Sequence, residues 1–504
     1  MTTELIAAVD LGSNSFRLQI GRIVNDQIYP LDGIKQPVRL AAGLSSDKRI
    51  DDAAQERALI ALQCFGERLS GFDPDAVRAV ATNTLRVAKN APHFLVRAEH
   101  ALGFPIEVIA GREEARLIYV GVAHNLPDPH KQQLIVDIGG GSTEFIIGKS
   151  FKPLMLESLY MGCVAFSLRY FPGGRIDKRG LKEAEIAARR ELQLIAHPYR
   201  ALGWEEAVGS SGTAKGLFEI LQQNGLAGDA ITREGLDNLR GVLLKAGSLD
   251  KLELSGIKPD RRPVLLGGFA IMSAVFREFE LERMLFSEGA LRLGVLYDLL
   301  GRYHHHDLRD ATVLAFLERY QVDAAHAAEV TSTARMLLAE LLPRVRDPLD
   351  PDGRFLDWAA QLHEIGISIA HSSYHKHSSY ILANADMPGF SRMDQGRLSR
   401  LVLAHRGKLA RVAAIDPGSV DWSMILCLRL AVVLHRARDG RGLPPVRLRA
   451  VDGGHELVCD DQWLAGLPLT EASLQEEQAQ WTTIGRKLKL RTEPAVLPLG
   501  SAGG

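Results

Sequence analysis

The sequence predicts an α/β protein with a duplicated core, followed by a helical region and a short strand-rich tail. Two segments of the same design carry this prediction: LIAAVDLGSNSFRLQIG, which starts at Leu5, and LIVDIGGGSTEFIIG, which starts at Leu134. Each is an apolar run that ends in an Asp, passes through a Gly/Ser turn and enters a second apolar run, a pattern typical of a strand–turn–strand hairpin. Strand and helix patterns alternate through residues 1–303, which indicates α/β layers.

Hydrophobic periodicity gives the other elements in chain order. In the first part these are strands at 76–81 and 106–110, a helix at 181–202, and a strand that runs into a glycine turn at 264–268. From 308 to 438 the helical period dominates, with helices expected at 324–342, 355–369 and 422–436. The tail alternates as strands do, in VRLRAV, HELVCD and KLKLRT. We therefore expect domains at 1–128, 129–303, 304–440 and 441–504, with the histidines at 304–306 in a polar connector.

Composition narrows the class of protein. With 46% hydrophobic and 24% charged residues among 504, the chain is typical of a globular protein. A formal net charge of −1 gives no overall attraction to nucleic acid or anionic membranes, so any polyanion site must be built locally. The four cysteines have no CxxC spacing, the N-terminus lacks a signal-peptide pattern, and the longest apolar stretch, 264–276, is too short to cross a bilayer. These features predict a cytoplasmic protein, with peripheral membrane association left open.

The first hairpin carries a candidate phosphate cradle. In DLGSNS, the backbone amides and hydroxyls of Ser13, Asn14 and Ser15 can surround phosphate oxygens, and Asp10 can hold a hydrated metal ion. A plain β-turn explains the same residue types, since Asp, Gly, Asn and Ser are common in turns. The second copy of the pattern favours phosphate binding in a cleft between the two halves.

The second hairpin gives a stronger signal. DIGGGSTE places three glycines directly after a strand, where they allow close approach of the backbone to a ligand. The expected phosphate-binding residues are Gly139, Gly140, Gly141, Ser142 and Thr143. Asp137 and Glu144 are oxygen ligands of the kind that Mg²⁺ prefers, although a turn aspartate and an exposed strand glutamate are the alternatives.

A third loop resembles the first two in composition. In AVGSSGTAKGLFEILQQNG, a strand ends at a glycine loop that opens a helix, so orphan N–H groups collect where a phosphate can bind. The candidate residues are Ser210, Ser211, Gly212 and Thr213. An ordinary helix N-cap at Ser211 or Thr213 accounts for the loop equally well.

The activation of water requires a base, and IEVIAGREEARLIYVGV supplies two candidates. Glu113 and Glu114 lie in the first turn of an expected helix, where the helix dipole stabilises a charged carboxylate. Adjacent helical residues point in different directions, so at most one of them faces the cleft, and the residues alone do not decide which. Arg86, in TNTLR, is a candidate clamp for a phosphoryl group, with a surface salt bridge as the alternative.

Together these segments resemble the exopolyphosphatase / guanosine pentaphosphate phosphohydrolase family. The resemblance covers nearly the whole chain, through AAVDLGSNSFRL, ATNTLR, GREEARLIYVGV, VDIGGGSTEF, MGCVAFSLRYFPGG, GSSGT, FSEGALRLGVLYD and LHEIG. It implies duplicated ribonuclease-H-like domains of the actin, Hsp70 and sugar-kinase type. It also implies Glu114 as general base, metal ligation by Asp137 and Glu144, a phosphate clamp at Arg86, Mg²⁺ dependence and a homodimer.

The region 304–440 resembles the HD phosphohydrolase fold, and 441–504 is expected to be a small α+β domain. His326 and His363 occupy the histidine positions of that fold, but Glu364 replaces an Asp and Val432 stands at the late Asp position. Because a metal site needs ligand number as well as ligand type, we expect a degenerate scaffold that helps to bind a long polyanion and supports dimerisation. Basic residues that can line such a path are His371, His375, Lys376, His377, Arg406, Lys408 and Arg411.

The sequence therefore predicts an exopolyphosphatase that releases terminal phosphate from inorganic polyphosphate by attack of a base-activated water, with Mg²⁺. HSSYHKHSSYIL, which starts at His371, resembles the long exopolyphosphatases and favours this activity. The first alternative is a guanosine pentaphosphate 5′-phosphohydrolase, with guanosine penta- or tetraphosphate as ligand. A sugar kinase or ATPase of the same superfamily and a non-catalytic polyphosphate sensor are further alternatives. No nucleic-acid partner is expected.

Overall fold

A computed structural model describes residues 5–494 except 25, 26, 127, 129, 304–306, 439 and 441, so the histidines expected in a connector lie outside the described residues. The chain divides into two compact units. The first contains residues 1–308 together with the short segment 388–392, and the second contains 309–387 and 393–504. No described helix combines the length and the apolar character that a membrane span requires.

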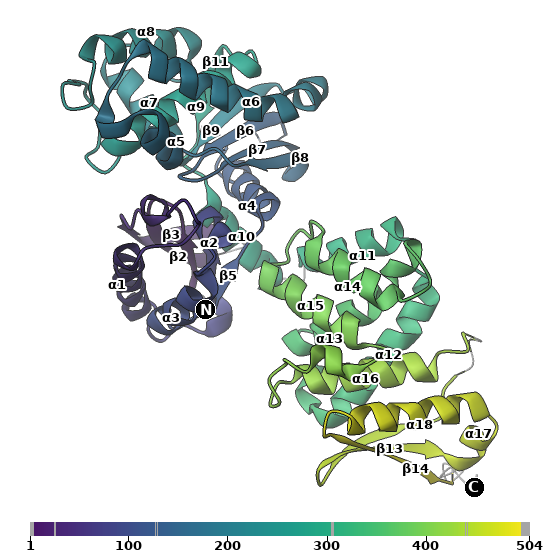
Figure 1. The fold of residues 1–504 in the computed structure, drawn as a ribbon. Coiled ribbons are helices and arrows are strands. Elements are labelled where there is room, and N and C mark those ends of the chain that lie inside the picture. Colours follow the sequence, from purple (N-terminus) through teal and green to yellow (C-terminus); the bar gives the residue numbers. More distant parts are fainter. Residues whose placement is uncertain are drawn as a thin grey trace. The chain divides into compact units, whose positions relative to one another are not determined.

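The first sheet of unit 1 has the strand order β3-β2-β1-β4-β5. Its antiparallel part is β1 (Leu5–Leu11), β2 (Phe16–Val24) and β3 (Gln27–Gln36), and the parallel strands are β4 (Val77–Ala81) and β5 (Ile106–Val108). Helices α1 (Asp52–Arg68) and α3 (Ala91–Leu102) bury their apolar side chains against one face of this sheet (Figure 1). The short helix α2 (Asn83–Val87) follows β4 directly, so polar residues after that strand stay close to the end of β1.

The second sheet repeats this arrangement, with the order β10-β11-β9-β6-β7-β8. Strands β6 (Gln133–Ile138), β7 (Thr143–Lys149) and β8 (Lys152–Leu159) form the antiparallel part. Strands β9 (Glu206–Ser210) and β11 (Arg283–Phe286) add in parallel, and β10 (Ile231–Thr232) closes the edge. Because β1-β2-β3 and β6-β7-β8 have the same antiparallel order beside a parallel strand, the duplication expected from the two glycine hairpins is confirmed in the fold.

Helices fill the space around the second sheet. One face packs against α5 (Cys163–Tyr170), α6 (Lys178–Leu202), α7 (Ser211–Gln223), α8 (Arg233–Ala246) and α9 (Leu265–Glu278). The other faces of both sheets share a core with α4 (Gly111–Ala123) and α10 (Leu291–Tyr303). These two helices pack closely, since a Cβ on Gly294 would lie 1.7 Å from the Leu117 carbonyl oxygen. The helix that carries the candidate base is therefore held inside the core between the sheets.

The prediction of a strand and glycine turn at 264–268 is wrong, because Val264 ends a 3-10 helix and the residues after it open α9. Its two glycines serve helix packing. A Cβ on Gly267 would lie 2.3 Å from the Cys163 carbonyl oxygen, and one on Gly268 would lie 2.5 Å from Thr213 Cγ2. Glycine at these two positions lets α9 approach α5 and α7. The sequence pattern, an apolar run with small residues, does not predict this helix packing.

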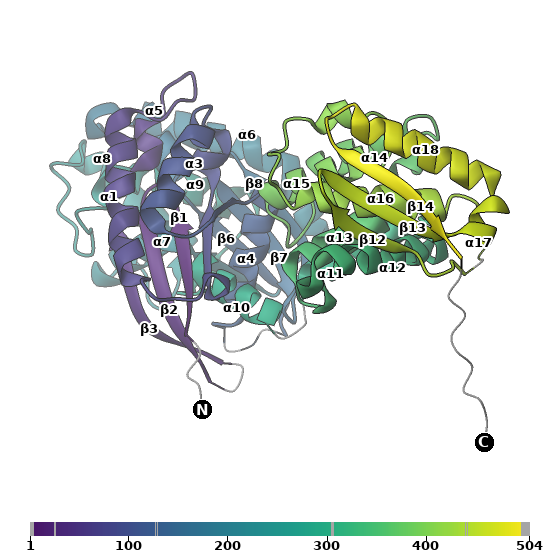
Figure 2. The same cartoon turned by 90° about the horizontal axis from the view of Figure 1, so that it is seen from below.

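Unit 2 combines a helical part with a small sheet. Its helices are α11 (Leu308–Arg319), α12 (Ala324–Leu341), α13 (Pro351–Leu362), α14 (Tyr374–Asn384), α15 (Arg392–Ala404) and α16 (Asp421–Leu434). Strands β12 (Arg447–Val451), β13 (Gly454–Asp460) and β14 (Lys487–Glu493) pair in that order. Helix α17 (Asp461–Ala465) follows β13, and α18 (Pro468–Thr482) packs beside the sheet (Figure 2). The succession of helices and tail strands agrees with the periodicity of the sequence.

Candidate active site

The turns of the two glycine hairpins face each other in unit 1. A Cβ on Gly140 would lie 3.0 Å from Ser13 Cβ and 3.3 Å from the Asn14 backbone nitrogen. A Cβ on Gly141 would lie 2.5 Å from Asn83 Oδ1, so Gly141 has no space for a side chain and Gly140 is tightly packed. The glycine run of the second hairpin is therefore explained by the close approach of the first hairpin and of α2, as well as by any approach of a ligand.

A cavity opens where the turns meet, and most of the predicted site residues line it. The lining includes four carboxylates, of which Glu288 was not predicted, and residues of all three loops. The predicted residues that line it are Asp10, Ser13, Asn14, Ser15, Glu114, Asp137, Gly139, Gly140, Ser142, Ser211 and Gly212. Three loops that are far apart in sequence thus contribute to one surface rich in N–H and hydroxyl donors.

Six predicted residues lie just behind this surface. Thr143 Oγ1 donates a hydrogen bond to the Met161 carbonyl at 2.6 Å, and Thr213 Oγ1 donates to the Ile138 carbonyl at 2.8 Å. The Ser210 hydroxyl donates to Asp137, and the Ser158 hydroxyl donates to Glu144 Oε1 at 2.7 Å. The six residues are Arg86, Gly141, Thr143, Glu144, Ser210 and Thr213. Their groups support the loops and carboxylates, whereas their assignment as direct phosphate or metal contacts stays a prediction.

Burial opposes ionisation of the carboxylates at the cavity. It raises the pKa of Asp137 to about 6 despite the Ser210 hydrogen bond, and the charge of Asp10 adds to the rise. It also raises the pKa of Asp10, and it raises that of Glu144 well above its ordinary value, with further contributions from Glu114 and Asp137. Within the described part of the chain, Asp10 Oδ1 is buried without a hydrogen-bond partner. A group of buried like charges with a free oxygen suits a hard cation, because a cation would offset the repulsion.

Glu114 and Glu113 take different directions from the first turn of α4. Glu114 lines the cavity, and Arg86 Nη1 donates a hydrogen bond to its Oε2 at 3.1 Å. Arg86 Nη1 also donates to the Ile109 carbonyl at 2.9 Å, which fixes the guanidinium beside Glu114. Burial raises the pKa of Glu114 to about 7, although the charge of Arg86 opposes the rise. A carboxyl with a pKa near 7 is well matched to accept a proton from water.

Sequence reasoning missed the basic residues of the cavity, Arg17, Lys215, Arg261 and Arg292. None of the three arginines forms an ion pair with the residues that the structure describes. Burial and the charge of Arg292 lower the pKa of Arg17 to about 10, the direction expected for clustered cations. Arg17 and Arg292 stand in the segments SNSFRLQIG and FSEGALRLGV, so an Arg beside each glycine-rich turn was the available signal. The cluster provides positive charge for an anionic ligand.

A side pocket adjoins this cavity and has a different character. Its apolar wall is formed by Leu217, Ile220, Ile257, Val264 and Leu265. It shares Arg17, Gly212, Lys215 and Arg261 with the cavity, so the two spaces are direct neighbours. Arg261 lies directly on the Gly212 backbone, where a Cβ would come within 1.9 Å of Nη2. The arrangement fits a ligand with a polyanionic part and an apolar part.

The helical part of unit 2 brings together the residues expected from the HD resemblance. His326, His363 and Glu364 each offer a ligand atom, and these atoms lie within 4.8 Å of one another. The His363 Nδ1 group contacts the Ala360 carbonyl at 2.6 Å, and burial lowers the pKa of His363 to about 4. Arg438 forms an ion pair with Glu364, so a cation already compensates the single carboxylate. Val432 lines the cavity beside this cluster.

Four of the seven basic residues proposed for a polyanion path in unit 2 fall into two groups. His371 and Arg406 line the same cavity as His326, together with Arg436 and Arg438, which were not predicted. His375 Nε2 instead contacts Arg411 Nη1 at 2.7 Å. A continuous path through all of them stays a prediction.

The fold and the site define a protein with two actin-like α/β domains, a helical third domain and a small C-terminal sheet, with facing glycine-rich loops between the first two. The chain belongs to the Ppx/GppA phosphatase family, whose model matches residues 19–303. A second model, of domain III of the same phosphatases, matches residues 308–478. The chain is therefore a hydrolase of this family, and the resemblance stated from the sequence is confirmed.

Curated relatives and solved structures agree on this family. The chain is 37% identical to a guanosine-5′-triphosphate,3′-diphosphate pyrophosphatase of Photobacterium profundum over 97% of this chain and 98% of the relative. It is also 37% identical to the enzyme of that name from Pseudoalteromonas translucida, over 96% and 98%. Among solved structures, an exopolyphosphatase from Cytophaga hutchinsonii is 26% identical with a TM-score of 0.54, over 59% of this chain and 98% of that one.

Proposed function

We propose that this protein hydrolyses the terminal 5′-phosphate of guanosine 5′-triphosphate 3′-diphosphate. The observation that carries the proposal is the side pocket, which combines an apolar wall with Arg17, Lys215 and Arg261 of the cavity. A nucleotide has an apolar base next to its phosphates, whereas inorganic polyphosphate has none. The full-length identity of 37% to pyrophosphatases of this nucleotide supports the same substrate.

In the proposed reaction, the loops bind the terminal phosphoryl group and Glu114 accepts a proton from water. The water oxygen attacks the terminal phosphorus, the bond to the bridging oxygen breaks, and orthophosphate and guanosine 5′-diphosphate 3′-diphosphate leave. Hydroxyls and amides of Ser13, Ser142 and Ser211, with the cavity arginines, stabilise charge on the phosphoryl oxygens. Arg86 acts through Glu114, because its guanidinium holds that carboxylate.

The donor set fits a divalent metal ion. Asp10 and Asp137, with Glu144 directly behind them, are buried carboxylates with raised pKa values, and Asp10 Oδ1 has no partner among the described residues. These residues would hold Mg²⁺, a hard ion that takes carboxylate, water and phosphate oxygens. Bound there, it would supply positive charge at the transferring phosphoryl group.

Inorganic polyphosphate is the second candidate substrate. The three arginines of the cavity suit any chain of phosphates, and the similar solved structure from Cytophaga hutchinsonii is an exopolyphosphatase. Both substrates present a terminal phosphoanhydride to the same groups. The two functions therefore differ only in what occupies the side pocket.

Substitution in the side pocket separates the two substrates. Ile257→Trp should fill the apolar space and reduce kcat/KM for the guanosine nucleotide at least about tenfold, while the rate on polyphosphate stays within twofold of wild type. Ile186→Trp, on the exposed face of α6, is the matched control. A wild-type enzyme that releases phosphate from polyphosphate and not from the nucleotide would replace the first proposal by the second.

We also infer that the protein acts as a homodimer in the cytoplasm, as the resemblance implies and the sequence predicts. Light scattering of the purified chain tests the dimer, because a mass near that of one 55.3 kDa chain would contradict it.

A further inference from the structure

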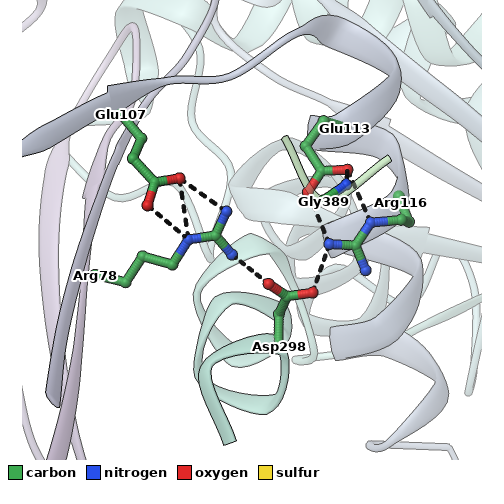
Figure 3. A network of polar contacts seen from close by, with 6 residues as sticks. All are labelled: Arg78, Glu107, Glu113, Arg116, Asp298 and Gly389. Carbon is green, nitrogen blue, oxygen red and sulfur yellow. Dashed lines mark hydrogen bonds and ion pairs between the residues drawn. The ribbon is translucent and has the colours of Figure 1, made fainter. Parts of the chain in front are cut away.

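A buried network of charges lies behind the cavity and includes the neighbour of the candidate base. Glu113 is only 4% exposed, and Arg116 donates to both of its oxygens, at 2.7 and 2.8 Å. Arg116 Nη2 also donates to Asp298 Oδ1 of α10 at 2.6 Å, and Asp298 Oδ2 accepts from Arg78 Nη1 of β4 at 2.6 Å. Arg78 pairs in turn with Glu107 of β5 at 3.0 Å (Figure 3).

The network also includes a segment from a distant part of the sequence. The Gly389 N–H donates to Glu113 Oε2 at 3.0 Å, in a buried hydrogen bond that joins residues 276 positions apart (Figure 3). Residues 388–392 group with unit 1, whereas the residues before and after them belong to unit 2. Gly389 has a φ of +86°, a left-handed conformation that a side chain disfavours, and the Phe390 side chain is 1% exposed. The segment is thus held in a specific conformation against Glu113.

Glu113 and Glu114 are joined by one peptide unit in the first turn of α4. The Glu114 N–H donates to the Ala110 carbonyl at 2.9 Å, so both glutamates belong to the same hydrogen-bonded turn. A rotation of that turn would move both side chains together. The contacts of Glu113 with Arg116 and Gly389 oppose such a rotation, while Arg86 holds Glu114 from the other side. If Glu113 only interacted with the helix dipole, it would need none of these buried partners.

We propose that Glu113 is a positioning residue whose hydrogen bond to Gly389 fixes the first turn of α4, so that the segment 388–392 controls the placement of Glu114 at the cavity. This inference rests on the proposed function for its kinetic readout. The phosphate-binding loops lie on other elements, and Glu113 does not line the cavity. Loss of the contact should therefore slow the chemical step and leave substrate binding nearly intact.

The test compares four variants by steady-state kinetics. Glu113→Ala and Gly389→Ala should each lower kcat at least about tenfold, with KM within twofold of wild type. Glu113→Gln keeps an oxygen that accepts the Gly389 N–H, so it should recover most of kcat. Glu107→Gln is the matched control, because Glu107 is at the far end of the network and on another element. Wild-type kcat in both alanine variants, or an equal loss in Glu107→Gln, would overturn the proposal.

Hydrogen exchange supplies a readout that needs no activity. The Glu114 amide should exchange at least tenfold faster in Gly389→Ala than in wild type, and at the wild-type rate in Glu107→Gln. Unchanged exchange in Gly389→Ala would refute the positioning role even where no substrate is turned over. If Glu113→Ala does not fold, Gly389→Ala and Glu113→Gln still decide the matter. If the wild-type protein is inactive on both phosphate substrates but Gly389→Ala still speeds exchange of the Glu114 amide, the proposed function is refuted and the positioning role is not.

Discussion

The carboxylates of the unit 1 cavity and the histidine cluster of unit 2 both gather buried titratable groups, but their charges are balanced differently. In unit 1, Asp10, Asp137 and Glu114 repel one another, and nearby Arg17 and Arg292 form no ion pair with the described residues. In unit 2, the imidazole of His363 stays neutral because burial lowers its pKa, and Arg438 already pairs with Glu364. In the first cluster Arg86 compensates Glu114, but Asp10 and Asp137 have no arginine partner among the described residues and suit a cation. In the second cluster the single carboxylate, Glu364, is already compensated by the protein.

Removal of divalent metal ions should have the largest effect, and it should act through the carboxylates of unit 1. Chelation should reduce turnover roughly a thousandfold or more, because a metal contributes several kcal/mol of charge stabilisation in such reactions. Added Mg²⁺ should restore the rate. Phosphate release measured with and without chelator is the assay, and Glu364→Gln, in unit 2, should show the same Mg²⁺ dependence as wild type. Turnover that survives complete chelation would contradict a metal role for the carboxylates.

Loss of the base should give the next largest effect. We expect Glu114→Gln to lower kcat at least about a hundredfold, since a positioned general base contributes about 10²–10⁴ in rate. Substrate affinity should persist, because the loops and arginines remain. Equilibrium binding of the nucleotide and single-turnover rates separate the two effects, with Glu67→Gln on the exposed face of α1 as control. A variant that turns over at nearly the normal rate would remove Glu114 from this role.

The arginines of the cavity should affect substrate binding more than the chemical step. Arg261→Ala removes a charged donor shared by the cavity and the side pocket, and a hydrogen bond to a charged group contributes about 1.5–3 kcal/mol. We therefore expect KM to rise roughly tenfold or more, with a smaller change in kcat. Arg438→Ala removes an arginine from unit 2 and should leave KM within twofold. Equal KM values in the two variants would show that the cavity cluster does not bind substrate.

Much of this site follows from local sequence patterns. Paired hairpins with matched Asp-turn-Gly segments predict two facing cradles, and Gly140 does lie against Ser13 and Asn14. Which of the two glutamates faces the cavity could not be read from the residues, because the buried partners of Glu113 are Arg116 and the distant Gly389. Long-range contacts of this kind leave no periodic signal.

The glycines of α9 are a second case in which long-range contacts could not be predicted from the local sequence. An apolar run with GG reads as a strand and turn, yet Gly267 and Gly268 are required by helices that pack against them. The arginines of the cavity were overlooked because a single Arg in an apolar run is typical of many surfaces. The local sequence therefore predicts the glycine-rich loops, whereas tertiary packing determines which other side chains line the cavity with them.

The smallest expected effect is that of pH on the free energy of unfolding, and it has opposite signs in the two units. Glu114 and Asp137 have pKa values of about 7 and 6 in the folded chain, above their ordinary values, so the folded form holds more protons between about pH 4 and 7. In chelator, the free energy of unfolding of unit 1 should therefore fall as the pH rises through that window. His363, at about 4, holds fewer protons in the folded chain, so unit 2 should lose stability as the pH falls from about 6.5 to 4.

Calorimetry at pH 5 and 7.5 in chelator measures this difference between the units. The transition of unit 1 should occur at least about 3 °C lower at pH 7.5, and that of unit 2 at least about 3 °C lower at pH 5. Glu114→Gln, which cannot ionise, identifies the first transition by weakening its pH dependence. Mg²⁺ should raise that same transition at pH 7.5, because a bound cation favours the ionised carboxylates. Two transitions that shift in the same direction would show that the charges of the two clusters are balanced alike, and the contrast between the units would fail.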